Sequence, residues 1–274
     1  MLALWVVFGV GVVVLLVAAV NVKTGKHCQG YQIDISGAED FMFLDRDDLV
    51  KIITKDGSIE LKGKELDLID LHNLETEIAH NIWVSRAELF FDNNLVLHVN
   101  VVEKEPVARV FTKTGTSFYI DSSGVRLPLS DKMSVKLPVF TSFPEVNGVW
   151  NANDSTLIQD VKRISEYILH DPFWMAQVAQ VSCEPEGNFE LVPMLGNHRI
   201  IFGSGEHYES KFRRLFLFYK EVLSKAGLDK FTVINVAYGN QVVATRKSSD
   251  IVKRSLPPVV PVSSIDSSTL RTTN

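Results

Sequence analysis

Hydrophobic positions in the first hundred residues switch between the period of strands and the period of helices. Apolar residues alternate along three short stretches and recur every three or four residues along two others. The predicted elements are a strand at 31–36, helices at 45–53 and 71–82, and strands at 83–91 and 95–101. This order predicts a compact α+β unit in which two helices cover one face of a small sheet.

Side chains near the element ends refine this prediction. Asp45, followed by Asp48 three residues later, is typical of a helix N-cap. The second helix is predicted to run to Ile82, with Glu75 and Glu77 facing solvent. The strand after it is predicted to place alternate side chains on one face, namely Trp83, Ser85, Ala87, Leu89 and Phe91.

The pattern changes after residue 103. Pro106 lacks the backbone N–H that a central strand needs, so it suits a strand edge or a domain junction. Short strands and two amphipathic helices follow. The strands are predicted at 107–111, 117–121, 125–127, 176–183, 189–193, 198–202, 231–236 and 241–246, and the helices at 155–170 and 208–226. We therefore predict a mixed β domain with two flanking helices, followed from Ser248 by a disordered tail rich in Ser, Thr and Pro.

None of the first twenty residues is charged. Eighteen of them are hydrophobic, and the other two are glycines. About 20 apolar residues, at 1.5 Å each, cross a hydrocarbon core about 30 Å thick. A cleavable signal peptide is the alternative, and Ala18-Ala19 resembles its cleavage site, but such a peptide begins with basic residues. The sequence favours a retained anchor at 1–22. Lys23 and Lys26 follow this segment, and by the positive-inside tendency alone they would place the body in the cytoplasm.

The composition of the whole chain narrows the class of protein to which it can belong. The net charge is −5, 46% of residues are hydrophobic, 22% are charged and two are cysteines. These values exclude a polytopic membrane protein, a disordered chain, a disulfide-rich scaffold and a strongly basic nucleic-acid binder. Cys28 and Cys183 are far apart in the sequence, so a disulfide between them stays open but is not favoured.

Motifs that carry catalysis are missing from the sequence, which has no Walker-type loop, no His-Glu-x-x-His and no Gly-x-Ser-x-Gly. Cys183 and His198 are the residue types of a nucleophile and its base, but a buried thiol is favoured. The loop at 203–205 resembles an anion site before a helix, although a simple turn is favoured. Glu103 and Glu105 share one side of a strand as paired acids would, but a solvated strand end is favoured. We predict no enzyme, cofactor, metal site or small-molecule substrate.

Four stretches of the sequence together resemble one protein family. They are Leu74-Glu75-x-x-Ile78 with Ile82-Trp83-Val84, then Leu95 to Ala108 with Glu103-Lys104-Glu105-Pro106, then Tyr119-Ile120-Asp121-x-x-Gly124 up to Pro128, and finally Val233 to Val243. The first two resemble the end of a POTRA domain and its junction, and the last two resemble the β domain of the bacterial division family FtsQ/DivIB. The sequence departs from the family at Asn235, where many members have Asp, at Ala237, where they often have Arg, and at Glu186, near a position where proteobacterial members can carry Arg.

The resemblance implies a domain order and a location. The domains would be an anchor at 1–22, a POTRA domain at 30–103, a β domain at 104–247 and a tail at 248–274. The protein would be a bitopic inner-membrane scaffold of the division septum with its body in the periplasm, which overrides the weak charge rule. The implied partners are FtsB and FtsL, with septal wall synthases of the FtsW and FtsI type as further candidates, and no nucleic acid.

The resemblance also suggests how partners would bind. A partner segment can extend a sheet by pairing with the open edge of its last strand. We predict that this edge is supplied by Tyr238, Asn240, Gln241, Val242 and Val243, with Tyr238 as a side-chain anchor, and that Glu103, Glu105 and Pro106 mark the domain junction. The alternative for the terminal residues is a covered core strand.

The runner-up function is a membrane-anchored POTRA chaperone for outer-membrane protein assembly or secretion. Such proteins usually carry several POTRA units or a C-terminal barrel, whereas the pattern here predicts one unit and no long alternating barrel strands. An exported enzyme ranks below both. The sequence therefore favours the division scaffold.

Overall fold

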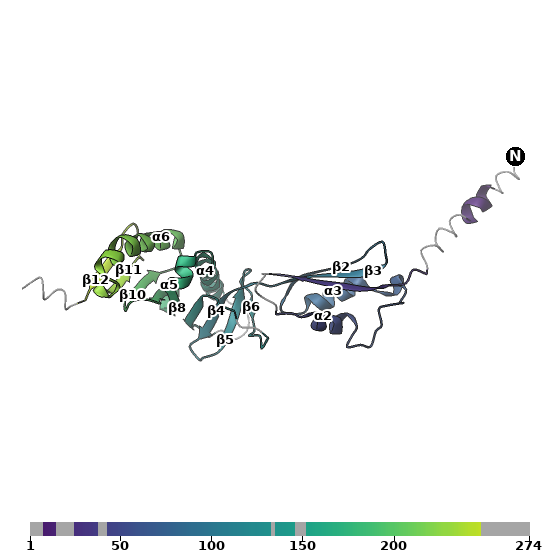
Figure 1. The fold of residues 1–274 in the computed structure, drawn as a ribbon, viewed down its shortest axis with the longest axis horizontal. Helices are drawn as coiled ribbons and strands as arrows, with labels where there is room; N and C mark the ends of the chain where they lie inside the picture. Colours follow the sequence, from purple (N-terminus) through teal and green to yellow (C-terminus); the bar gives the residue numbers. More distant parts are fainter. Residues whose placement is uncertain (1–7, 15–24, 38–42, 133–134, 146–151, 248–274) are drawn as a thin grey trace, which may run out of the picture. The chain divides into compact units, whose positions relative to one another are not determined.

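The computed structural model describes residues 8–14, 25–37, 43–132, 135–145 and 152–247, with only the backbone at 152–154. Its contacts divide the chain into two compact units, 1–137 and 138–274, which we describe separately (Figure 1). Most of the predicted anchor at 1–22 and all of the predicted tail at 248–274 lie outside the described residues. Within the described residues, no helix combines the length and the apolar character needed to cross a membrane.

The first unit begins with a three-stranded sheet and two helices. The elements are β1 (Gly30–Ser36), α2 (Arg46–Ile53), the 3-10 turn η1 (Leu66–Leu68), α3 (Leu71–Ala79), β2 (Val84–Phe91) and β3 (Val96–Glu103). The strand order is β1-β3-β2, with β1 parallel and β2 antiparallel to β3. Both helices lie on the same side of this sheet (Figure 1). The predicted α+β class and element order are therefore confirmed.

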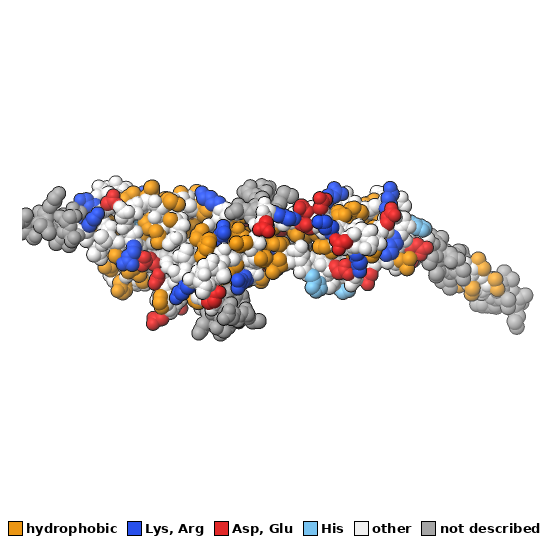
Figure 2. Space-filling view, turned by 90° about the horizontal axis from the view of Figure 1, so that it is seen from below, with side chains coloured by type: hydrophobic (Ala, Val, Ile, Leu, Met, Phe, Trp, Pro, Cys, Tyr) orange, Lys and Arg blue, Asp and Glu red, His pale blue; other side chains and the backbone are white. Residues whose placement is uncertain are grey.

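Apolar side chains from both helices and from the central strand form the core of this sheet. The buried residues are Leu49 and Ile53 of α2, Leu74 and Ile78 of α3, and Leu97, Val99 and Val101 of β3. Asp45 caps α2 as predicted, because its side chain accepts a hydrogen bond from Asp48 N at 2.9 Å and the Asp48 side chain accepts one from Asp45 N. On the face drawn in Figure 2, acidic and basic side chains are interspersed.

The second helix is shorter than predicted and one of its carboxylates faces inward. α3 ends at Ala79, so Ile82 lies beyond the helix and is 47% exposed. Glu75 was predicted to face solvent, but its Oε1 accepts a hydrogen bond from Leu89 N at 2.8 Å. This bond connects α3 to β2 and occupies one backbone donor of an edge strand.

A bulge breaks the alternation predicted for β2. The pairing with β3 shifts register between Val84 and Arg86, and as a result Val84 is buried and Ser85 is exposed. An extra residue on one strand reverses the phase of the side chains beyond it. The prediction for this face is therefore correct at Leu89, which is buried, and wrong at Ser85.

Three short strands complete the described elements of the first unit. They are β4 (Pro106–Thr112), β5 (Ser117–Asp121) and β6 (Arg126–Leu127), which pair antiparallel in that order. Asp121 shapes the turn after β5, because its Oδ1 accepts hydrogen bonds from Ser123 N at 2.9 Å and Val125 N at 2.7 Å. Gly124 in this turn has a φ of +86°, which favours glycine. The Tyr-Ile-Asp-x-x-Gly stretch is thus a buried strand followed by its own turn.

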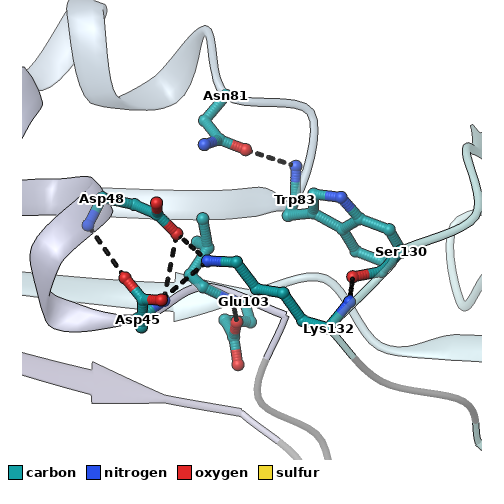
Figure 3. Close-up of polar contacts among 8 residues, drawn as sticks. Asp45, Asp48, Asn81, Trp83, Glu103, Ser130 and Lys132 are labelled. Atoms are coloured by element: carbon teal, nitrogen blue, oxygen red, sulfur yellow. Dashed lines mark hydrogen bonds and ion pairs between the residues drawn. The ribbon is translucent and has the colours of Figure 1, made fainter.

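The carboxylate of Glu103 is buried at the end of β3 and holds the segment before α2. Glu103 is 6% exposed, and its Oε1 accepts a hydrogen bond from Leu44 N at 2.5 Å (Figure 3). Burial raises the pKa of Glu103, and hydrogen bonds from the N–H groups of Leu44 and Phe43 oppose this rise. Glu105 is exposed. The prediction of a solvated strand end is therefore wrong for Glu103, which continues the buried face of β3.

Aromatic side chains extend this contact to the hairpin of β4 and β5. The rings of Phe43 and Trp83 stack with centroids 4.1 Å apart and planes 5° apart. The indole of Trp83 meets the ring of Tyr119 on β5 edge-on at 6.3 Å. Asn81 fixes the backbone here, because its Oδ1 accepts a hydrogen bond from Trp83 N at 3.0 Å (Figure 3). One aromatic cluster thus joins the helical sheet to the following hairpin.

A lysine from beyond β6 reaches the N-terminus of α2. Lys132 Nζ lies 2.8 Å from Asp45 Oδ2 and also contacts the carboxylate of Asp48 (Figure 3). The hydrogen bond from Lys132 lowers the pKa of Asp45 to about 2, with a further contribution from Asp48 N. The hydrogen bonds to Asp45 and Asp48 in turn raise the pKa of Lys132. Asp45 and Lys132 are therefore both charged near neutral pH.

The second unit is a mixed sheet with helices packed on it. Its elements are β7 (Val139–Phe143), α4 (Ala152–Leu169), α5 (Pro172–Gln177), β8 (Val178–Glu184), the 3-10 turn η2 (Pro185–Gly187), β9 (Asn188–Pro193), β10 (Arg199–Gly203), α6 (Tyr208–Phe218), the π-helical turn η3 (Tyr219–Leu223), α7 (Ser224–Ala226), the 3-10 turn η4 (Leu228–Lys230), β11 (Phe231–Asn235) and β12 (Val243–Arg246). The strand order is β12-β11-β10-β9-β8-β7. β7 with β8 and β10 with β11 are parallel, and the other pairs are antiparallel. The predicted mixed sheet is confirmed.

Two helical features of this unit differ from the predicted pattern. The six residues of α5 are too few to show a helical period, and Asp171 caps the helix by accepting a hydrogen bond from Phe173 N. The predicted helix 208–226 is interrupted by η3. Phe216, on the α6 part of this predicted helix, is 38% exposed.

We expect Glu103→Ala to lower the free energy of unfolding by about 2 kcal/mol, because it leaves the buried Leu44 N–H without its acceptor. Glu105→Ala removes an exposed carboxylate two residues away and should change this free energy by less than about 0.5 kcal/mol. Urea denaturation of both variants measures the difference. Equal effects would contradict a role for Glu103 in holding this segment.

We also expect Lys132→Met to raise the pKa of Asp45 from about 2 toward 3.8, the value without these interactions. Because the folded-state pKa is lowered, the stabilisation from this contact is present above about pH 4 and is lost as the pH falls toward 2. NMR titration of the carboxyl carbon measures the pKa. Lys136→Met, which removes another exposed lysine, is the control and should leave the pKa of Asp45 unchanged.

Candidate functional site

Strand β12 forms one end of the sheet of the second unit. It pairs antiparallel with β11, with Val243 opposite Asn235 and Thr245 opposite Val233. Among the described residues, no strand pairs with its other side. Consecutive residues of an antiparallel strand direct their N–H and C=O groups alternately to the neighbour and away from it. β12 therefore presents unpaired backbone donors and acceptors along its outer edge.

The segment before β12 is held against the sheet at its start. Val236 is buried, and its N–H donates to Ile201 O at 3.0 Å. Asn235 Oδ1 accepts a hydrogen bond from Ala237 N at 2.9 Å, a role that an aspartate could also fill. Gly203 approaches closely, since a Cβ at this position would lie only 2.8 Å from Ala237 Cβ. A small residue at 237 thus fits this crowded contact.

Arg214 from α6 fixes the next part of the segment. Its Nη2 donates to Val236 O at 2.9 Å and to Tyr238 O at 3.2 Å, and its Nη1 donates to Ser210 Oγ at 2.7 Å. The carbonyls of Val236 and Tyr238 are thereby occupied within the unit. No sequence pattern distinguishes Arg214 from its exposed neighbour Arg213, so sequence reasoning missed it.

The five predicted partner-binding residues all lie between Tyr238 and Val243, at the start of this edge. Only Val243 belongs to β12, where it is 45% exposed. Tyr238, Asn240 and Gln241 are exposed and Val242 is half-buried in the segment that leads into the strand. The predicted strand therefore begins two residues too early at 241. Asn240 has a φ of +59°, a turn conformation that interrupts a strand.

A cavity of about 420 Å³ adjoins this segment. It is lined by Ser204, Glu206, His207, Ser210, Lys211, Arg214, Ala237, Gly239 and Asn240. Lys211 is buried, and its Nζ donates to Ser204 O at 2.7 Å. Burial lowers the pKa of Lys211, with a further contribution from nearby Arg214.

The loop 203–205 is occupied by a carboxylate of the chain itself. Asp160 of α4 accepts a hydrogen bond from Gly205 N, and burial raises the pKa of Asp160. A Cβ on Gly205 would lie 2.2 Å from Asp160 Cγ, so glycine is required for this approach. The helix-entry turn favoured from the sequence is thus present, and its backbone donor is already used.

The other described residues whose side chains could take part in catalysis or metal binding are not brought together in one site. Cys28 and Cys183 are both buried, and they are not joined in a disulfide. Cys183 lies on β8 and His198 precedes β10, with β9 between these strands. His198 Nε2 is instead 2.8 Å from the Tyr219 hydroxyl oxygen, and burial lowers the pKa of His198. In the part of the chain that the structure describes, no group of three acidic, histidine or cysteine side chains could hold a metal.

The three predicted junction residues have different environments. Glu103 is buried at the end of β3, Glu105 is exposed, and Pro106 is buried as the first residue of β4. The side chain of Glu103 accepts the hydrogen bond from Leu44 N, whereas Glu105 contributes its backbone carbonyl, which accepts a hydrogen bond from Ser122 N at 3.0 Å.

We expect Arg214→Met to speed amide hydrogen exchange in residues 238–243 and to lower the free energy of unfolding by about 2 kcal/mol, because two carbonyls lose a charged donor. Arg213→Met is the matched control on an exposed neighbouring position and should change neither quantity. Hydrogen–deuterium exchange with mass spectrometry resolves this segment. Unchanged exchange in the Arg214 variant would show that the guanidinium does not fix it.

Comparison with known proteins agrees with this architecture. A family model described as "FtsQ/DivIB, C-terminal related" matches residues 105–245, and a model for a "POTRA-like domain" matches residues 26–102. Cell division protein FtsQ of Geotalea daltonii (strain DSM 22248 / JCM 15807 / FRC-32) is 25% identical over 231 residues, which cover 80% of this chain and 82% of that protein. The first match alone spans more than half of the chain. The chain therefore belongs to the FtsQ/DivIB family of bacterial cell division proteins.

Proposed function

We propose that this protein is a non-enzymatic, bitopic membrane scaffold of the divisome that links division proteins at the septum by β-strand addition. The observation that carries the proposal is the outer edge of β12, which has no neighbour among the described strands. A partner strand placed there would satisfy its backbone groups and continue the sheet. Family membership supports the role in cell division.

The geometry limits where a partner strand would pair. Arg214 already occupies the carbonyls of Val236 and Tyr238, so pairing would begin after this point and continue along β12. Tyr238 is 54% exposed beside the start of the edge and would bury its ring against the partner. Main-chain bonds would supply affinity, and Tyr238 with Val243 would supply side-chain selectivity.

The proposed partners are FtsB and FtsL, with septal wall synthases of the FtsW and FtsI type as further candidates. Among its described strands, the POTRA-like domain offers two more open edges, since β1 and β2 end its three-stranded sheet. Glu75 already occupies the Leu89 N–H of β2, which leaves β1 as the less obstructed edge. We assign the divisome contacts of this domain to that strand.

The proposed organisation follows the predicted one. An anchor at 1–22 would hold the protein in the inner membrane, the domains at 30–103 and 104–247 would lie in the periplasm, and a tail would follow at 248–274. Septal enrichment is expected for a scaffold of this kind. Imaging a fluorescent fusion of the full chain tests this location, and uniform envelope staining would contradict septal recruitment. Depletion of the protein is a separate test, and filamentous growth would support a division role.

Proline substitution tests strand addition at β12. Of Ala244 and Thr245, one N–H faces β11 and the other faces outward, because the two residues are consecutive. We expect one of Ala244→Pro and Thr245→Pro to lower the melting temperature and the other to leave it unchanged. The variant that leaves the melting temperature unchanged should capture FtsB and FtsL at least about tenfold less well than the unsubstituted protein. It removes an outward backbone donor at an edge position that tolerates proline.

Side-chain variants, tested for capture of FtsB and FtsL in the same way, distinguish a specific role of Tyr238 from a general effect of changing an exposed side chain. Tyr238→Ala should weaken capture by about tenfold, as expected for an aromatic residue buried at an interface. Leu217→Ala, at a similarly exposed position on α6, is the control and should leave capture intact. If both proline variants are folded and still capture FtsB and FtsL in full, strand pairing at β12 is ruled out.

A further inference from the structure

A second hollow of the second unit is apolar and shares no lining residue with the cavity beside the segment before β12. It has a volume of about 590 Å³. Its lining residues are Phe173, Phe216, Tyr219, Lys220, Leu223, Ser224, Gly227 and Leu228. Aromatic and aliphatic side chains form most of this lining, and Lys220 and Ser224 are exposed. We call it the aromatic groove.

Ring contacts fix the shape of the aromatic groove. Phe173 of α5 meets Phe216 edge-on with centroids 5.1 Å apart and Tyr219 with centroids 5.8 Å apart. Tyr219 belongs to the π-helical turn η3, a rare conformation that is frequent at functional sites. Phe216 is 38% exposed, so part of this apolar surface is open to a ligand.

Buried hydrogen bonds hold Tyr219 in place. Its hydroxyl oxygen lies 2.8 Å from His198 Nε2 and accepts a hydrogen bond from Gln177 Nε2 at 3.3 Å. Burial raises the pKa of Tyr219 to about 12, so the hydroxyl keeps its proton at physiological pH. The groove is therefore formed before any ligand arrives, which reduces the entropy cost of binding.

The chain itself continues from a point beside this groove. Lys247 is the last described residue, and its N–H donates to Lys230 O at 3.1 Å. Gly227 and Leu228, which line the groove, precede Lys230 by three and two residues. The residues from 248 to 256 can span about 30 Å when extended, so residues after 256 can reach the groove.

The composition of the tail matches an aromatic groove. Residues 256–262 read Leu-Pro-Pro-Val-Val-Pro-Val, in which Pro258 and Pro261 have the spacing of a Pro-x-x-Pro ligand. Segments of this kind adopt polyproline II with little loss of entropy and dock in grooves lined by aromatic rings. We propose that residues 256–262 of this chain occupy the aromatic groove, with prolines and valines packed on Phe173, Phe216 and Leu228.

Attachment to the same chain strengthens such a contact. A short flexible connection gives an effective concentration of about a millimolar, so even a weak peptide contact is populated. The inference does not depend on the partner role of β12, and either can fail without the other.

Cross-linking in the full chain tests the proposal. We introduce Ser224→Cys at the groove rim and Ser263→Cys directly after the segment, and measure the yield of the intramolecular disulfide. The two natural cysteines are buried, so they should not compete. We expect the yield to fall at least about fivefold when Val259→Asp and Val260→Asp are added, because the segment can then no longer pack on apolar rings.

Groove variants provide the matched comparison. Phe216→Glu should reduce the yield by a similar factor, whereas Leu217→Glu, at an exposed neighbouring position outside the groove, should not. Circular dichroism of each variant confirms that it is folded. Equal yields with and without the valine substitutions would overturn the proposal, and so would a disulfide formed only between two copies of the chain.

A second measurement does not rely on cysteines. A fluorescent peptide of residues 254–264, added to the chain ended after Lys247, should bind saturably, and a peptide with Pro258→Ser and Pro261→Ser should bind at least about fivefold more weakly. Absence of saturable binding at millimolar peptide would overturn the proposal independently of the cross-links.

Discussion

The buried carboxylate of Glu103 is the contact on which the first unit depends. It lies at the end of the central strand and accepts a hydrogen bond from Leu44 N, which fixes the segment leading into α2. That segment places Phe43 on Trp83 and the Asp45 cap within reach of Lys132. A buried charge is costly unless its oxygens are hydrogen-bonded, so the carboxylate and the segment constrain each other. One side chain thereby joins the sheet, the helix cap and the hairpin that follows.

Contacts within the second unit also hold the segment that precedes the candidate interaction edge. A strand edge is a useful binding surface only if the chain beside it is ordered, because a partner must otherwise supply the cost of ordering it. Arg214 holds two carbonyls of the preceding segment, and the close contact of Gly203 with Ala237 fixes its start. The free edge therefore begins at a defined point.

Much of the fold was predictable because local chemistry and burial agree. Asp45 with Asp48 forms the capping box that their spacing indicates, and the alternation from Leu97 to Val101 is the buried face of β3. The predictions failed where a distant partner decides the outcome. Glu75 faces inward because it meets the Leu89 N–H, and the bulge at Val84 reverses a face that simple alternation assigns. The π-helical turn at Tyr219 lies within an unbroken helical pattern and has no signal of its own.

Four features can be inferred from the amino-acid pattern, namely the order of elements, the α+β class, the family resemblance and the stretch of chain that contains the terminal strand. These follow from periodicity and turn chemistry, which act between residues close in the chain. Tertiary structure alone decided that Glu103 is buried while Glu105 is exposed, that Asp160 occupies the loop at Gly205, and that Arg214 limits the edge at β12. Each of these depends on a contact between residues far apart in the sequence. A pattern read along the chain cannot contain it, because the partner is brought there only by folding.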